Sequence, residues 1–517
     1  MQSAAHTTVE GVAPVGLPSD TACAAAVRLE SARLRLVAAA LCGLLVAVPF
    51  LAVQFPPVTD LPQQVAQIRL FLAALGDPDG AYRIQWYTPY SASYVLLGAA
   101  WALCTPVNAG RVAVLALGVL WAVAVHDLAA RRRRPVAAAV LASMLFFNHT
   151  VYWGFLSFGV GSLAFVVWFL VTVRDPDDGF SWRDGLAQFG AGLLLYVSHA
   201  LWFGAGIVWL ALYAVAHRWP LRVTLPRLAC VAPIAIGVAL WYPHLAALGF
   251  VSPTIWFTPP FARLSPEWIV DAVFGGLSGP AEPLMAVILL AWVVGGLAQP
   301  RGAWRAGADA DLVWTGVGFI ALGLVLPDKH MNTIQFAARW LPMGAMLVVL
   351  GVPPPALLRA WQRPLAVAVL VVFSLVTTLA WRRFERDELT GLPAALAALP
   401  DGQRVIGLDL VQESPVIKGR PFLQTFAYAQ VLHGGRLNAS FAGFAPSLVV
   451  YRHRRPIPWT PNLEWFAERV RPDDVTYFDY ALINGGADIH AQAQAWPLAA
   501  VTDAGRWRLY RVTAARP

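Results

Sequence analysis

A nearly continuous apolar run over residues 36–55 constrains the fold of this chain more than any other feature. A helix over the run rises about 30 Å, which matches the hydrocarbon thickness of a lipid bilayer. Arginines precede the run, and basic flanks of a spanning helix stay on the cytoplasmic side. We therefore expect a disordered cytoplasmic tail over residues 1–35, a first membrane crossing, and an outside loop that carries Asp60.

The composition extends the membrane interpretation to most of the chain. Of the 517 residues, 58% are hydrophobic and 13% are charged, whereas a soluble protein has about 25% charged residues. The net charge of +8 comes largely from arginine clusters beside apolar runs, so we expect no nucleic-acid partner. Lys329 and Lys418 are the only lysines, and a chain rich in Arg, Ala, Gly and Pro is typical of high-GC bacteria. The predicted location is a bacterial inner (plasma) membrane.

Further apolar segments follow between residues 91 and 381, and with the first they number twelve. Twelve crossings disagree with the arginine-rich loops, which belong in the cytoplasm. The disagreement disappears if one segment between residues 91 and 130 does not cross, which a break at Pro106 and Gly110 favours. We therefore expect 11–12 transmembrane segments and favour eleven crossings. The cytoplasmic loops would be 131–134, 174–183, 217–227, 301–305 and 359–363, and the outside loops 56–90, 244–282 and 327–340.

From about residue 385 the composition becomes that of a soluble domain. About 130 residues suffice for one small domain. β-branched and aromatic residues predict strands, and a turn followed by periodic apolar residues predicts a helix at 461–470. The strands would be 404–408, 475–483 and 507–512. The predicted fold class is an α-helical polytopic membrane protein over residues 36–381 with an extracytoplasmic α/β domain over residues 385–517.

Asp60 is the strongest candidate for a catalytic group. An outside carboxylate beside an apolar wall can have a raised pKa and accept a proton from an incoming hydroxyl, or it can hold a divalent cation. No other cofactor is indicated. The alternative is a helix cap, because residues 63–75 have apolar side chains at helical spacing and Pro62 stands near the first turn. That helix is expected to lie on the membrane surface.

Lys329, His330 and Arg339 bring cationic groups to an outside loop, against the usual distribution of charge. Such a cluster between two spans suits a phosphate held at the depth of the lipid headgroups. The alternative is that these side chains only extend from the ends of the spans toward water. Because lysine is so rare in this chain, the pattern favours phosphate binding.

Polar residues interrupt the apolar segments at two further places. Ser198 and His199 break one run, and a polar break inside a membrane has to face protein or a cavity. Asn148 and His149 form a polar hairpin between two spans, where His149 could assist a carboxylate or a metal or could simply be hydrogen-bonded. Tyr87 belongs to a group of aromatic residues that is typical of a membrane interface.

Together these features resemble the GT-C glycosyltransferases, such as protein O-mannosyltransferases and the lipid A aminoarabinose transferase. The resemblance rests on the acid-bearing outside loop with its helix, on the entry at residues 87–90 to the next segment, on the polar break at His199, and on the basic loop from Lys329 to Arg339. It covers residues 36–381.

The resemblance implies a sugar transfer from a polyprenyl-phosphate-linked donor to a lipid, glycan or protein acceptor of the cell envelope, with inversion at the sugar carbon. Asp60 would bind or deprotonate the acceptor hydroxyl. The donor phosphate would be bound by His199, Lys329, His330 and Arg339, and the acceptor or sugar would be contacted by Gln64, Tyr87, Asn148 and His149. Many members have a second acid beside the first or a lysine at the polar break, whereas this chain has Leu61 and His199.

Two other function classes are consistent with the sequence. A transporter or flippase of lipid-linked or polar solutes typically has paired internal repeats and ionisable residues at mid-span. The chain has no obvious repeat and few charges deep in its apolar runs. A non-catalytic envelope assembly protein would not need the carboxylate of Asp60.

Overall fold

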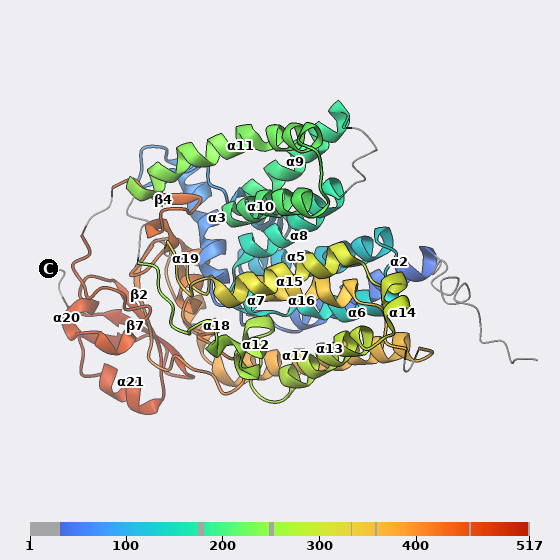
Figure 1. Cartoon of the computed structure of the whole chain (residues 1–517). Helices are drawn as coiled ribbons and strands as arrows, with labels where there is room; N and C mark the ends of the chain where they lie inside the picture. The colour runs from blue at the N-terminus through green and yellow to red at the C-terminus, as the bar shows by residue number, and fades with distance from the viewer. Residues whose placement is uncertain are drawn as a thin grey trace, which may run out of the picture.

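The computed structural model describes residues 32–173, 180–247, 253–331, 333–356, 359–453 and 456–514. Helices form an elongated bundle, and a C-terminal region with a small sheet packs against one end of it (Figure 1). We call this the sheet end, and we call the opposite end, where Arg132 and Arg134 follow α5, the arginine end. Most of the expected tail, residues 1–31, lies outside the described residues.

Apolar helices of 8 to 27 residues make up the bundle. Its helices are α2 (Ala32–Ala52), α5 (Pro106–Arg131), α6 (Val136–Ser143), α8 (Leu156–Thr172), α9 (Trp182–Ser198), α10 (Ala200–Ala216), α11 (Leu221–Ala247), α13 (Ala281–Leu297), α15 (Ala310–Val325), α16 (Leu341–Gly351) and α17 (Gln362–Glu388). Five other helices lie between them in the chain, namely α3 (Leu61–Gly76), α4 (Ser91–Leu103), α7 (His149–Tyr152), α12 (Pro266–Val273) and α14 (Arg301–Gly307).

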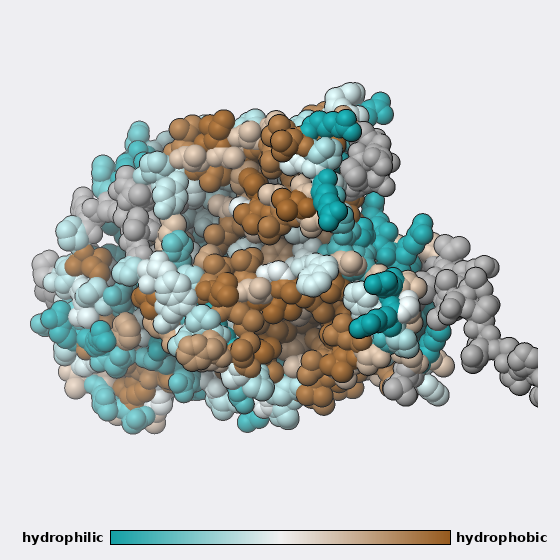
Figure 2. All heavy atoms as spheres, viewed as in Figure 1, coloured by the Kyte–Doolittle hydropathy of each residue, from teal (hydrophilic) through white to brown (hydrophobic). Residues whose placement is uncertain are grey.

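Within the described residues, four helices are long and apolar enough to cross a membrane: α2, α5, α11 and α17. The bent pair α13 and α14 would be a fifth, and six shorter apolar helical segments of 10–17 residues accompany them. Apolar side chains cover the middle of the bundle, and hydrophilic ones gather toward both ends (Figure 2). The chain therefore has the helix content and the surface expected of a helical membrane protein.

Arginines tie helix termini together at the arginine end. Arg132, after α5, donates hydrogen bonds of 2.6–2.8 Å to the carboxylates of Asp309 and Asp311 at the start of α15. Arg134 donates to the carbonyl oxygens of Leu350, Gly351 and Val352, where α16 ends. These carbonyls have no partner within their own helix, so the arginine replaces water there. The end of α5, the start of α15 and the end of α16 therefore share one end of the bundle.

Helix α4 starts and finishes at the sheet end. Its N-cap residue Tyr90 lines a cavity there together with Asp60. Helix α5 begins after two intervening residues. Its Arg111 donates a hydrogen bond of 2.8 Å to the carbonyl oxygen of Val53, which follows α2. A helix of 13 residues rises about 20 Å, less than a bilayer core requires. Both ends of α4 therefore lie at the sheet end.

The C-terminal region is built on a five-stranded sheet of order β3-β2-β5-β7-β6. Its strands are β2 (Arg404–Asp409), β3 (Arg436–Leu437), β5 (Tyr480–Asn484), β6 (Leu498–Ala500) and β7 (Trp507–Val512). β2 pairs in parallel with β3 and β5, and β7 pairs antiparallel with β5 and β6. The predicted strand 475–483 is wrong in its first half, where helix α20 (Pro472–Val475) and a turn precede β5. The predicted helix 461–470 is also wrong, because the segment consists of turns and one 3-10 turn at Ala467–Arg469.

Helix α3 is present where the apolar spacing predicts it, but it does not lie free on a surface. Gln63 donates to Gln424 Oε1 (2.9 Å) and Ala439 O (3.0 Å), and its Oε1 accepts from Phe441 N (3.0 Å). Gln67 Oε1 accepts from Val449 N at 2.8 Å. Both glutamines are buried, because the C-terminal region covers the polar face that we expected to meet water. A short antiparallel pair, β1 (Tyr82–Ile84) with β4 (Val449–Tyr451), adds a second attachment.

Candidate functional site

A cavity of about 1160 Å³ lies at the sheet end, between the helix termini and the C-terminal region. Six of the residues singled out in the sequence line it, although they come from separate segments: Asp60, Gln64, His149, His199, Lys329 and Arg339. They belong to the loop before α3, to α3 itself, to α7, to the junction of α9 and α10, and to the segment between α15 and α16. The cavity is therefore the place where the sequence candidates meet.

The backbone of Asp60 is fixed by the hairpin that follows α7. Thr59 N and Asp60 N donate to the carbonyl oxygens of Tyr152 (2.9 Å) and Trp153 (3.1 Å). Gly154 has a φ of +79°, and a Cβ atom there would lie 2.8 Å from Asp60 N. Only glycine adopts this conformation and permits this approach without strain. The hairpin thus holds Asp60 at the cavity wall.

The side chain of Asp60 does not act as a helix cap. Asp60 occupies the N-cap position of α3, yet its carboxylate makes no capping hydrogen bond. Burial raises the pKa of this carboxyl group to about 7, although the nearby Arg339 guanidinium lowers it. A carboxyl group with this pKa exchanges protons readily near neutral pH, as a general base must. Its environment therefore suits proton transfer better than capping.

Arg339, in the 3-10 turn η4 (Ala338–Trp340), is buried in the cavity wall. Its Nε and Nη2 atoms donate to the carbonyl oxygen of Ile334 at 3.2 and 2.7 Å, and its Cζ lies 3.5 Å from the centroid of the Phe155 ring. In the described part of the chain no carboxylate pairs with it. A side chain that merely extended toward water would be exposed. A buried cation that contacts an aromatic face and a carbonyl is instead placed to bind an anion.

Lys329 lies in the same wall, in a loop that is held rigidly by its neighbour Asp328. Oδ2 of Asp328 accepts hydrogen bonds from Phe257 N (2.8 Å), Thr258 N (3.0 Å) and Arg263 Nη2 (2.9 Å). Arg263 also donates to the last carbonyl oxygens of α15 and is fully buried. Asp328 and Arg263 thus have structural partners, and Lys329 has no ion-pair partner among the described residues.

His199 adds a hydrogen-bond donor to the lining of the cavity. It caps α10, because its Nδ1 accepts a hydrogen bond from Leu201 N at 3.2 Å. In the neutral ring the proton then resides on Nε2 and is available as a donor. The rings of Tyr90 and Phe158 meet the imidazole edge to face, at centroid distances of 4.8 and 5.5 Å. His199 therefore offers one oriented N–H group to the cavity.

The remaining predicted residues divide between the cavity and its surroundings. His149 is buried at the cavity wall, and its Nε2 has no hydrogen-bond partner among the residues that the structure describes. Asn148 is the N-cap of α7, with Oδ1 accepting from Thr150 N and Val151 N, and it does not line the cavity. Tyr87 is 84% exposed and does not line the cavity. His330 is also outside the lining, with Nδ1 2.9 Å from the hydroxyl of Thr254.

The C-terminal region contributes cavity residues that sequence reasoning missed. Lys418 lines the cavity and donates to Asp271 Oδ1 (2.5 Å) and Glu282 Oε2 (3.2 Å) near α12 and α13. Glu464 and Trp465 line it from the segment that we expected to be a helix. The one signal available was that Lys418 is, with Lys329, one of two lysines in the chain.

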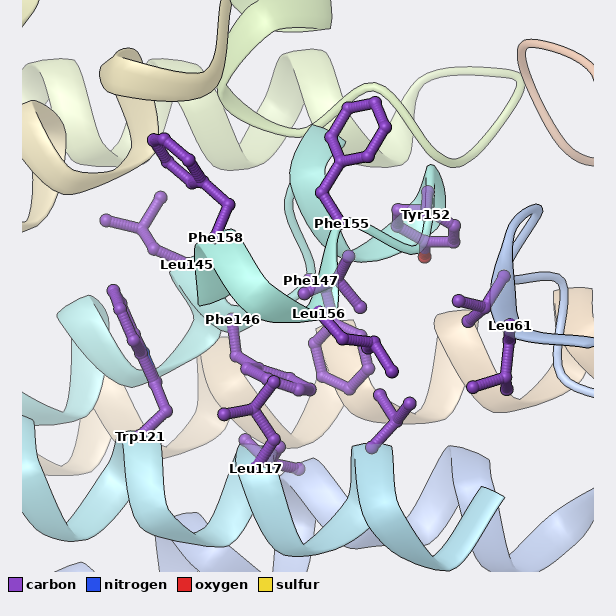
Figure 3. Close-up of a cluster of buried hydrophobic side chains, with 14 of the residues drawn as sticks. Leu61, Leu117, Trp121, Leu145, Phe146, Phe147, Tyr152, Phe155, Leu156 and Phe158 are labelled. Atoms are coloured by element: carbon purple, nitrogen blue, oxygen red, sulfur yellow. The ribbon is translucent and has the colours of Figure 1, made fainter. Parts of the chain in front are cut away.

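Beneath the cavity the bundle is closely packed. Figure 3 shows side chains from α3, α5, η1 (Met144–Phe146), α7 and α8 converging there, among them Leu61, Leu117 and Phe146. Phe50 of α2 meets Trp381 of α17 at a centroid distance of 4.8 Å in the same layer. This apolar layer, the packed floor, adjoins the cavity, because Phe155 belongs to the layer and also lines the cavity.

No group of three or more His, Cys, Asp or Glu side chains in the described ranges is arranged to hold a metal ion. Comparison of the chain with protein-family models and with curated proteins finds no match. The chemical role of the site therefore follows from the residues that line the cavity.

Proposed function

We propose that this protein is a GT-C-like glycosyltransferase of the bacterial inner membrane. It would move a sugar from a polyprenyl-phosphate-linked donor to an envelope acceptor on the extracytoplasmic side, and Asp60 would be the base. The observation that carries the proposal is the convergence of Asp60, His199, Lys329 and Arg339 on one cavity at the sheet end.

The proposed reaction divides its roles between the carboxylate and the cationic or N–H groups that line this cavity. The Asp60 carboxylate takes the proton of an acceptor hydroxyl while the acceptor oxygen bonds to the anomeric carbon of the donor sugar. The bond between that carbon and the phosphate oxygen breaks, and its electron pair stays on the phosphate. Arg339, Lys329 and the N–H group of His199 stabilise the departing phosphate through charge-assisted hydrogen bonds. Attack from the side opposite to the phosphate inverts the anomeric carbon.

The orientation of the helices supports eleven crossings. Eleven crossings result if α6 and α7 are one crossing, if α3, α4, α12 and α14 lie at the ends, and if each remaining helix of the bundle runs opposite to its predecessor. The loops that follow α5, α10 and α16 lie at the arginine end, which would be cytoplasmic. The sheet end, with the cavity and the C-terminal region, would then be extracytoplasmic.

The packed floor argues for a transferase over a transporter. A transporter needs a route that opens to each side of the membrane in turn. Here the ring of Phe50 packs against those of Phe146 and Trp381, at centroid distances of 6.0 and 4.8 Å, in the layer that adjoins the cavity. A transferase that takes a lipid-linked donor and an acceptor from one side needs no such route.

The decisive experiment measures donor consumption by the purified full-length protein in detergent. A panel of polyprenyl-phosphate sugars with a labelled sugar is incubated with protein and an envelope extract, and released polyprenyl phosphate is quantified. We expect consumption by the parent, none above background by Asp60→Asn, and parental rates for Asp127→Asn. Asp127 is a matched control, because it is an exposed acid paired with Arg131 near the arginine end. A parent that consumes no donor but moves lipid-linked sugars across vesicle membranes would establish a flippase instead.

A further inference from the structure

Three aromatic rings form a continuous row along the cavity wall. The rings of Phe155 and Trp153 are stacked with centroids 6.0 Å apart and planes inclined by 14°. Trp153 is stacked in turn on Trp465, at 6.5 Å and 26°. All three residues line the cavity, and both tryptophans are partly exposed. Arg420 Cζ lies 5.9 Å from the centroid of the Trp465 ring and covers part of it, and the tryptophan surface that remains exposed lines the cavity.

The row connects the two halves of the proposed site. At one end the Arg339 guanidinium lies 3.5 Å above Phe155. In the middle the carbonyl oxygen of Trp153 accepts the hydrogen bond from Asp60 N. At the other end Trp465 belongs to the C-terminal region. A ligand lying on the two tryptophans would thus extend from the C-terminal region toward Asp60.

The loop that carries Trp465 is anchored to the loop that carries Asp60. Thr59 donates from its hydroxyl to the carbonyl oxygen of Arg420 at 3.3 Å. Arg420 Nη1 donates to the carbonyl oxygen of Trp465 at 2.8 Å. These two bonds hold the tryptophan beside the residue that precedes Asp60. The platform and the base are therefore positioned by one short network.

Polar side chains surround the platform. Glu464, next to Trp465, lines the cavity, and burial raises the pKa of its carboxyl group. It forms no ion pair within the described residues. Asn462 and Gln64 also line the cavity and carry amide groups that donate and accept hydrogen bonds. An apolar platform with carboxylate and amide groups at its edge suits a ligand with an apolar face and hydroxyls at its rim.

We propose that the acceptor is a saccharide whose ring stacks on the Trp153–Trp465 platform, with Glu464 and Asn462 binding its hydroxyls. The assignment of this ligand as the acceptor rests on the proposed function above. A sugar ring has C–H groups on its faces and hydroxyls around its edge, which is the pattern that the platform complements. A lipid chain would leave Glu464 buried without a partner, at a cost in binding free energy. An extended peptide has no flat face of this size.

The test is direct binding of free saccharides to the full-length protein in a detergent without a sugar headgroup. Saturation-transfer NMR is recorded with maltotriose, mannotriose and chitotriose as probes. We expect transfer to the ring C–H protons of at least one probe. Trp465→Ala should weaken its binding about tenfold or more, as removal of a central tryptophan does. Trp465→Phe should restore part of the binding, because a smaller aromatic face remains.

The matched control is Trp314→Ala, which removes an exposed tryptophan of α15 outside the cavity lining. It should bind the probes like the parent. Absence of saturation transfer from the parent to every saccharide, or equal binding by the parent and Trp465→Ala, would overturn the proposal. Donor consumption without saccharide binding would leave the transferase standing and remove the saccharide site. Saccharide binding lost in Trp465→Ala without any donor consumption would support the site and count against the transferase.

Discussion

Arg339 lowers the pKa of the Asp60 carboxyl group, yet the two side chains form no ion pair within the described residues. A direct pair would neutralise both groups and remove them from chemistry. Because the two groups are not paired, the guanidinium can bind a second anion and the carboxylate can accept a proton. Burial outweighs the attraction of Arg339, so that the carboxyl group titrates at about 7.

The first prediction concerns the base. Asp60→Asn preserves the size of the side chain but removes its charge and most of its basicity, so sugar transfer should fall by a factor of about 10²–10⁴. The backbone bonds from Thr59 and Asp60 to the α7 hairpin do not involve the side chain, and the protein should still purify as one species. The initial rate of donor consumption measures the effect. Near-parental transfer by Asp60→Asn would remove Asp60 from the mechanism.

The same variant should be more stable than the parent at alkaline pH. The unfolded Asp60 loses its proton near pH 3.8 and the folded one near pH 7, so the folded state binds more protons between these values. The free energy of unfolding therefore decreases as pH rises through this window, and the full penalty is present above it. Asparagine carries no such penalty. The folded fraction that remains after heating is measured by size-exclusion chromatography. At pH 8, Asp60→Asn should stay folded to higher temperatures than the parent. The two proteins should behave alike near pH 4.

Removal of a cation should weaken donor binding. Arg339→Gln and Lys329→Gln should each cost ~1.5–3 kcal/mol in apparent donor affinity, the usual contribution of a charge-assisted hydrogen bond. The loss should appear mainly in KM, provided that the phosphate is held equally in the ground state and the transition state. Free polyprenyl phosphate should inhibit the parent and inhibit both variants less. Unchanged inhibition would show that the phosphate is bound elsewhere.

The pH profile should separate the two cations. If the Asp60 carboxylate is the base, the parental rate should rise as pH increases through about 7. Arg339 lowers this pKa, so Arg339→Gln should move the rising limb to higher pH. Lys329 is not among the groups that shift the pKa of Asp60, so Lys329→Gln should leave the limb in place. Equal displacement in both variants would contradict this arrangement.

The sequence predicted the helical architecture and identified six polar residues of the cavity for a common reason. Asp60, His199 and Lys329 stand out because charged or polar groups are costly beside apolar spans. The C-terminal region could not be placed in the same way, because Trp465 and Glu464 look like ordinary residues of a soluble domain. The burial of Gln63 and Gln67 could not be predicted from the sequence either. Their burial depends on which loop covers α3, and periodicity carries no information about that contact.

Gly154 should be as important for activity as a residue that contacts substrate. A Cβ atom would lie 2.8 Å from Asp60 N, and the φ of +79° disfavours any other residue. Gly154→Ala should displace Asp60 and reduce donor consumption by about 10²-fold, the usual effect of a misplacement of about 1 Å. Gly190→Ala, inside α9, is the control, because no heavy atom lies within 4 Å of its Cβ position. If Gly154→Ala has the same activity as Gly190→Ala, the hairpin does not position the base.

The last prediction concerns the side of the membrane on which the cavity opens. If α4 stays at the sheet end and the chain crosses the membrane eleven times, the end of α17 should be extracytoplasmic. Asp60 should be on the same side. A reporter that is active only outside the cytoplasm, fused after residue 390, should therefore be active, and the same reporter fused after Arg132 should be inactive. Arg132 is bound to Asp309 and Asp311 at the arginine end, so this fusion tests the opposite side of the membrane. Activity of a cytoplasm-only reporter after residue 390 would place the cavity in the cytoplasm. The donor and the acceptor would then have to be sought on that side.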